Sequence, residues 1–82
     1  MGELDCCKYH SALGAVEEIT AELASVIVAE HFGFTPNYQR AVDYINGYID
    51  HLVKMAPDDK ETLLKQAVQQ ASEAADYLVS LT

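Results

Sequence analysis

Basic side chains are scarce in this sequence. Five Lys and Arg residues stand against 13 Asp and Glu residues, which gives a formal net charge of −8 at pH 7. Nucleic acids are held mainly by Lys and Arg side chains that neutralise phosphates, so we expect no direct nucleic-acid binding. An acidic surface can instead dock on a basic protein surface, although an acidic excess also serves solubility alone.

Long apolar runs and targeting signals are also missing. The longest apolar run, SVIVA at residues 25–29, is far shorter than the roughly 20 residues of a membrane span, so we expect no membrane partner. The N-terminal MGELDC is acidic and lacks the basic-then-apolar order of a secretory signal. We therefore predict a cytoplasmic protein, in the host cytoplasm if a phage or mobile element encodes it.

Half of the residues are apolar, which indicates a folded chain rather than a disordered one. We predict one helical domain over residues 1–82, because apolar residues recur at three-and-four spacing along three segments. The predicted fold is all-α, an antiparallel three-helix bundle with helices at about 4–31, 37–56 and 59–81. A chain this short has a thin margin of stability, which a partner subunit would increase.

Short turns are predicted between the helices. Gly33 is expected to stop the first helix, and Thr35 and Pro36 are expected to supply the N-cap and first-turn proline of the second. Asp58 and Glu61 have the spacing of a capping box for the third helix. The first two helices should therefore be antiparallel neighbours.

The predicted first helix is unusually long. About 28 residues span about 42 Å, against about 30 Å for 20 residues, so this helix should either kink near Gly14 or project beyond the other two. Residues 23–32, LASVIVAEHF, are apolar nearly all round, and Val28 points away from the face that Leu23 and Ile27 define. Such a segment is usually buried on more than one side, which favours a homodimer.

The spacing also predicts which side chains form the core. In the first helix the main stripe is Tyr9, Leu13, Val16, Leu23 and Ile27. In the second it is Tyr38, Ala41, Val42, Ile45, Ile49 and Leu52. In the third it is Leu64, Ala67, Val68, Ala71, Ala75 and Leu78, where the alanines would let a neighbouring helix approach closely.

Four residues of the second helix form a flank beside its core stripe: Tyr44, Tyr48, His51 and Met55. Tyrosine and methionine suit a protein contact, because they combine apolar area with a polar tip or a flexible thioether. The same flank would alternatively widen the core towards the third helix. The predicted protein interface combines this flank with four residues of the first helix, namely Glu17, Glu18, Glu22 and Val28.

The stretch LDCCKYH raises the question of a metal site. Cys7 and His10 share one side of a helix and are the candidate ligands, whereas Cys6 points about 100° away. A closed zinc site needs four ligands, which Asp58 or Asp59 from the second turn would have to complete. The simpler interpretation is that the cysteines are small apolar residues, so we predict no metal and no cofactor.

The sequence contains no Gly-rich phosphate loop, nucleophile elbow or Ser-His-acid spacing, so we predict no enzymatic activity. The leading hypothesis is a noncatalytic protein that binds and modulates another protein, as an inhibitor, antagonist or adaptor, and that forms a dimer. Two alternatives stay open. One is a metal-binding module or enzyme centred on Cys7 and His10, and the other is a structural subunit of a larger assembly.

Overall fold

The computed structural model describes the backbone of residues 2–81 and the side chains of residues 10–81. It consists of α1 (Gly2–His31), α2 (Tyr38–Met55) and α3 (Lys60–Ser80), and the described residues include no strand. The predicted antiparallel three-helix bundle is therefore confirmed. Each predicted boundary lies within two residues of the observed one, which is the usual uncertainty of helix ends.

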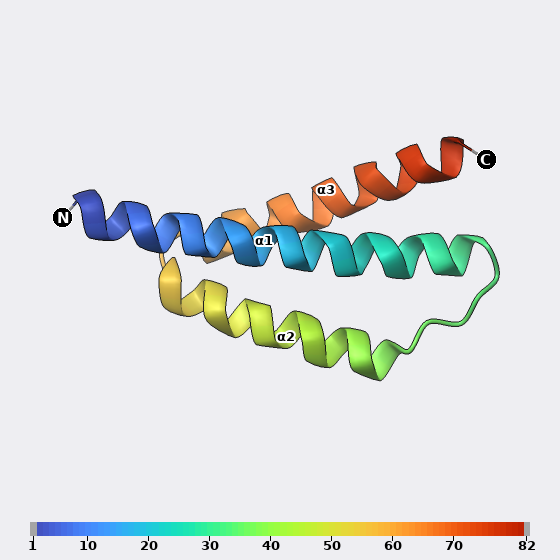
Figure 1. Cartoon of the computed structure of the whole chain (residues 1–82), viewed down its shortest axis with the longest axis horizontal. Helices are drawn as coiled ribbons and strands as arrows, with labels where there is room; N and C mark the ends of the chain where they lie inside the picture. Colours follow the sequence, from blue (N-terminus) through green and yellow to red (C-terminus); the bar gives the residue numbers. More distant parts are fainter. Residues whose placement is uncertain (1, 82) are drawn as a thin grey trace.

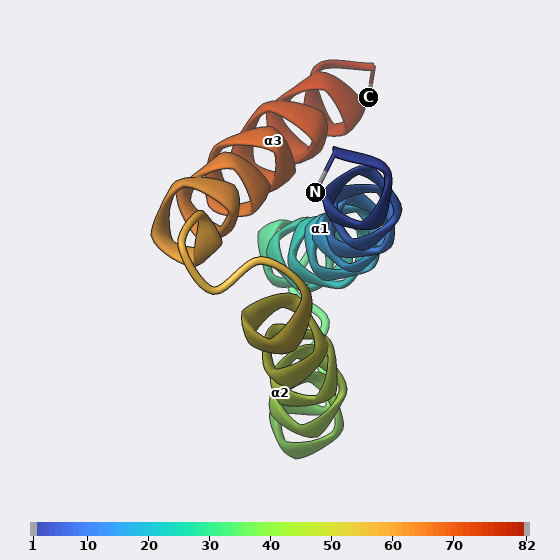
Figure 2. The same ribbon diagram turned by 90° about the vertical axis from the view of Figure 1, so that its left-hand side faces the viewer.

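The bundle is flat, because α1 lies between the other two helices (Figure 1). Turned by 90°, the molecule has α3 on one side of α1 and α2 on the other, with few contacts between α2 and α3 (Figure 2). Its principal extents are 48 × 26 × 16 Å. The buried side chains lie along α1, where one core cluster joins residues of α1 to Leu52 of α2 and to Leu63 and Ala67 of α3.

Of the two predictions for the long first helix, the projecting helix is the one observed. α1 continues as α-helix from Gly2 to His31, and its first turns extend beyond the end of α2 (Figure 1). Gly14 lies exposed within this unbroken helix, and a Cβ atom built there would meet no other heavy atom within 4 Å. In the part of the chain that the structure describes, no helix is both long enough and apolar enough to cross a membrane.

Gly33 ends α1 as predicted. Its φ of +81° is in the left-handed region that glycine adopts without steric cost. The Gly33 amide donates to the Glu30 carbonyl at 3.1 Å, and the Phe34 amide donates to the Ala29 carbonyl at 2.9 Å. These two bonds form a Schellman motif, which satisfies carbonyls that would otherwise lack partners at the end of the helix.

The predicted caps of the other helices are wrong. The N-cap of α2 is Asn37, whose side-chain oxygen accepts from the Arg40 amide at 3.0 Å, so Thr35 and Pro36 lie before the cap. Asparagine caps well because its short side chain reaches a free amide in the first turn. The residue before α3 is Asp59 rather than Asp58, and its side chain makes no capping hydrogen bond.

Alanine dominates the core. Among the described residues the largest fully buried side chains are those of Ile19, Leu52 and Leu63. The remaining buried residues are mostly small: Ala12, Ala15, Val16, Ala24, Ala41, Ala56, Ala67, Ala71 and Ala75. These alanines let α2 and α3 pack closely on α1, but each contributes little apolar area to stability.

The buried face of α3 was predicted only in part. Its stripe starts at Leu63 and continues through Ala67, Ala71 and Ala75, whereas Leu64 is half-buried. Val68 and Leu78, predicted as core, are 59% and 45% exposed. The contact face is rotated towards the alanines because α3 packs mainly on α1, so the larger side chains beside that face remain in solvent.

The same open arrangement explains the errors in the other two helices. Tyr38 and Val42 of α2 were predicted as core but are 48% and 50% exposed, and Ile27 of α1 is 38% exposed. Ala41 and Leu52 are buried as predicted. In a closed bundle α3 would cover the second side of α2. Here α2 and α3 diverge, so only the side of α2 that faces α1 is buried.

Candidate functional site

A line of polar contacts joins α2 to α1. The Tyr44 hydroxyl donates to a Glu18 carboxylate oxygen at 2.7 Å, and Ser11 Oγ lies 2.6 Å from His51 Nε2. Both contacts follow the antiparallel register of the two helices, so residues 26 and 40 positions apart in the sequence come together. These bonds hold the polar tips of the tyrosine flank against α1.

Two further contacts continue this line towards the connection between the helices. Arg40 Nη1 lies 4.0 Å from Glu22 Oε2, and the Tyr38 hydroxyl donates to Glu30 Oε2 at 2.5 Å. The Arg40 side chain is 70% exposed, whereas that of Glu22 is only 15% exposed. An ion pair at such a separation and exposure contributes little to the stability of the fold.

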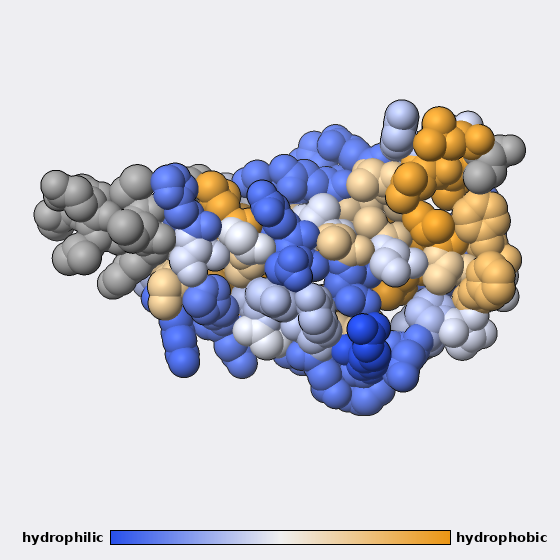
Figure 3. Space-filling view, in the orientation of Figure 1, coloured by the Kyte–Doolittle hydropathy of each residue, from blue (hydrophilic) through white to orange (hydrophobic). Residues whose placement is uncertain are grey.

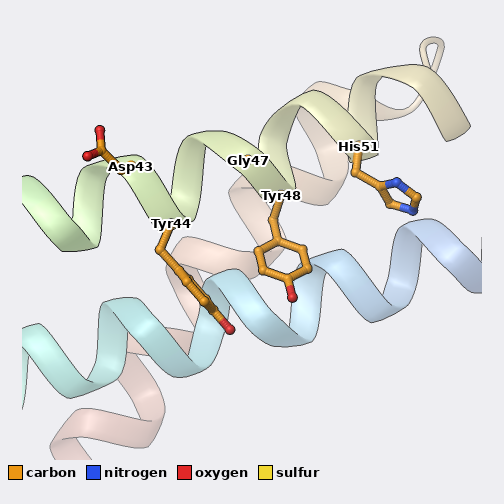
Figure 4. Close-up of a pocket in the computed structure, with 5 residues that line it drawn as sticks. All are labelled: Asp43, Tyr44, Gly47, Tyr48 and His51. Carbon is orange, nitrogen blue, oxygen red and sulfur yellow. The ribbon is translucent and has the colours of Figure 1, made fainter.

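Beside this line, α2 presents an open groove of about 480 Å³ lined by Asp43, Tyr44, Gly47, Tyr48 and His51. Figure 4 shows the two tyrosines and the histidine extending from α2 towards α1. The rings of Tyr44 and Tyr48 have centroids 5.1 Å apart and planes inclined at 54°, a favourable arrangement for an aromatic pair. The groove therefore combines aromatic faces with a carboxylate at its edge.

Hydrogen bonds to carboxylates favour the protonated hydroxyls of Tyr44 and Tyr38 and raise the pKa of each. Donation to Glu18 raises the pKa of Tyr44 well above its usual value of 10.0, with smaller effects from Tyr48 and from partial burial. Donation to Glu30 similarly raises the pKa of Tyr38. The cause is the same in both tyrosines. A carboxylate that accepts a hydrogen bond from the phenol favours the neutral phenol over the phenolate.

The predicted flank is only partly assembled at the groove. Tyr44, Tyr48 and His51 line it together, and Gly47 and Asp43 complete it, although the sequence analysis did not single out these two. Met55 is half-buried against the core cluster, and Tyr48 also packs against it. The tyrosines and His51 extend towards α1, and through Tyr48 and Met55 part of the flank also widens the core.

The predicted contact residues of α1 have different environments. Glu17 is exposed, whereas Glu18 and Glu22 are half-buried and already contact Tyr44 and Arg40. Val28 is half-buried near the C-terminal end of the helix and does not line the groove. Of the predicted acidic residues, Glu17 is thus the most accessible to a partner.

The candidate metal ligands can be followed only in part. The side chains of Cys6 and Cys7 lie outside the described residues, and His10 is exposed. Within the described part of the chain, no group of three His, Cys, Asp or Glu side chains is arranged to hold a metal ion.

The contact between Ser11 and His51 has the chemistry of a nucleophile and a base, which the sequence alone did not reveal. A serine hydrolase also needs an acid that orients the imidazole and amides that stabilise an oxyanion. Among residues 10–81, no carboxylate is hydrogen-bonded to His51, and Ser11 lies inside a helix whose amides are engaged in the helix itself. The pair therefore serves to join α1 and α2.

Comparison with known proteins gives one partial likeness. The chain is 34% identical over 77 residues to phosphoglycerate kinase of Chlamydia pneumoniae, an alignment that covers 84% of this chain but 19% of that enzyme. The chain thus spans about a fifth of the length of the curated protein it matches, and the likeness does not establish enzymatic activity. No family model matches the chain. No solved structure matches it either.

Proposed function

We propose that this chain is a noncatalytic binding protein that docks on a basic surface of another protein through the groove on α2. The observation that carries the proposal is the groove itself, which the paired rings of Tyr44 and Tyr48 line together with exposed Asp43. Aromatic faces attract Lys and Arg side chains, and a nearby carboxylate adds a charged hydrogen bond.

The groove is preorganised for binding. Tyr44 is held by Glu18 and His51 is held by Ser11, so their side chains lose little conformational freedom when a partner arrives. Tyrosine is well suited to this role because it offers a large contact area with only two rotatable side-chain bonds. An inhibitor or adaptor that works by covering a partner's surface needs no chemistry beyond such contacts.

Net charge supports a basic partner. A chain with a formal charge of −8 attracts a positively charged surface and speeds the encounter. Glu17 of α1 and Asp50 of α2 are exposed and add to this attraction. Binding should consequently weaken as salt rises, because about 1 M salt reduces the screening length to about 3 Å.

Two helical glycines, Gly14 and Gly47, provide a matched test. Gly47 lines the groove and Gly14 does not, yet both are exposed and both have no heavy atom within 4 Å of an added Cβ. Gly47→Lys should fill the groove and repel a basic partner, while Gly14→Lys adds the same charge outside the residues that line the groove.

The experiment is affinity capture from a lysate of the source cells, with wild type and both variants at equal concentration. A protein retained by wild type and Gly14→Lys, lost by Gly47→Lys and eluted by salt supports the proposal. Equal capture by Gly47→Lys would remove the groove from the binding site, and the absence of any salt-sensitive capture by wild type would contradict a basic partner.

A further inference from the structure

Large apolar side chains are exposed at the end of the molecule where α1 and α3 finish. Phe32 is 46% exposed, Phe34 72%, Leu78 45% and Leu81 64%, and Ile27 lies nearby at 38%. In the space-filling view, apolar atoms gather over the C-terminal ends of α1 and α3 and the turn after α1 (Figure 3). We call these five residues the apolar end.

The apolar end contrasts with the core of the same chain. Most of the buried residues are alanines, and the three largest fully buried side chains are Ile19, Leu52 and Leu63. A domain of this size is marginally stable even when its apolar residues are well buried. Covering the apolar end would remove from water several side chains larger than most of those now in the core.

The apolar end itself contains no charged side chain. Residues 32–36 and 77–81 include no Asp, Glu, Lys or Arg, although the chain carries a net charge of −8. Two copies of this acidic chain would repel each other across most orientations. An uncharged apolar surface is the place where they can meet with the least repulsion, and it offers nothing specific to a basic partner.

We propose that the apolar end is a self-association surface, where a second copy of this chain packs its own apolar end against the first. A two-fold axis between the copies would place the same patch on both sides, as in most homodimers. This surface is separate from the groove on α2. The proposal of self-association is therefore tested independently of partner binding at the groove.

The test is sedimentation velocity of the 82-residue chain from low to high micromolar concentration. Wild type should form a dimer, and Phe34→Glu and Leu81→Glu should each raise its dissociation constant at least tenfold, because each buries a carboxylate and adds repulsion. Val68→Glu is the matched control: Val68 is 59% exposed on α3 and ten residues, about 15 Å, before Leu78. It should dimerise like wild type.

Two measurements make the result decisive. Far-UV circular dichroism should give equal helicity for wild type, Phe34→Glu, Leu81→Glu and Val68→Glu, since all three positions are exposed. Raising salt to about 1 M should leave the wild-type dimer intact or strengthen it, because salt screens the repulsion between copies. A wild type that stays monomeric, or folded Phe34→Glu and Leu81→Glu variants that dimerise like wild type, would overturn the proposal.

Discussion

The Tyr44 hydroxyl of α2 donates a hydrogen bond of 2.7 Å to the Glu18 carboxylate of α1, across 26 residues of sequence. The bond holds Tyr44 beside the groove, in the register that the packing of the two helices sets. It also makes a prediction about pH, because the carboxylate raises the pKa of the phenol above its usual value of 10.0.

A group whose pKa is higher in the folded state stabilises the fold fully below its unfolded pKa, here about 10, and loses that contribution as pH rises further. We therefore expect the melting temperature of wild type to fall above about pH 10 more steeply than that of Tyr44→Phe, which keeps the ring but has no proton to lose. Thermal melts followed by circular dichroism between about pH 8 and 11 measure the difference. Tyr77→Phe, at a ring that is 65% exposed, is the control and should behave like wild type.

The register of α3 makes a second prediction. Leu63 is 2% exposed and belongs to the core cluster, whereas its neighbour Leu64 is only partly buried. Leu63→Ala should lower the free energy of unfolding by about 2–5 kcal/mol, and Leu64→Ala should lower it by clearly less. Urea denaturation measures both. A larger loss at Leu64 would mean that α3 is rotated relative to the structure described.

Replacing Gly33 by alanine should change the stability of the fold in the opposite direction to replacing Gly14 or Gly47. Gly33 has φ +81°, so Gly33→Ala should destabilise by about 1–2 kcal/mol. Gly14→Ala and Gly47→Ala, within helices and with open space around the added methyl group, should each stabilise by about 0.5–1 kcal/mol. The measurement is again urea denaturation. A destabilising Gly14→Ala would contradict an unbroken α1 at that position.

Close packing of α3 on α1 predicts the effect of a larger side chain. Ala67 is fully buried, and its backbone carbonyl accepts from the Thr20 hydroxyl at 3.4 Å. Ala67→Leu should destabilise by about 1–3 kcal/mol because α3 must move away from α1 to make room. Gln66→Leu, one position earlier and exposed, is the control and should change stability little. Equal melting temperatures for the two variants would show that the helices pack less closely than described.

The sequence alone predicted the three helices because their apolar spacing is a local signal. The end of the first helix at Gly33 could also be predicted from the sequence. The left-handed conformation at the end of a helix favours glycine whatever the tertiary structure. The N-cap of the second helix could not be predicted in this way. Thr35 and Asn37 are both good capping residues, and only the path of the turn decides which one meets a free amide.

The arrangement of the helices could not be predicted in the same way. Periodicity indicates which residues share a face, but not whether α2 and α3 close on each other, so Tyr38, Val42, Val68 and Leu78 were assigned to a core that the open bundle does not have. The tyrosine flank was identified from spacing, since Tyr44, Tyr48 and His51 follow one side of α2.

The sequence alone did not show which residues of α1 contact that flank. Ser11 and His51 meet across 40 residues, and Tyr44 meets Glu18, only because packing sets the register of α1 and α2. The charge of Glu18 and Glu22 was noticed in the sequence, but not that these side chains contact Tyr44 and Arg40 within the chain. A signal for this was available, as tyrosine, arginine and histidine recur on α2 opposite acidic and hydroxyl residues on α1.

The central claim, that a protein partner occupies the groove on α2, is tested most directly by photo-cross-linking in a lysate of the source cells. A benzophenone amino acid replaces Gly47 in one variant and Gly14 in the other, both exposed glycines with open space around them. The account predicts a discrete cross-linked adduct from position 47 that is absent from position 14 and is suppressed by salt in the lysate. Adducts of equal yield from both positions, or none from position 47, would contradict it.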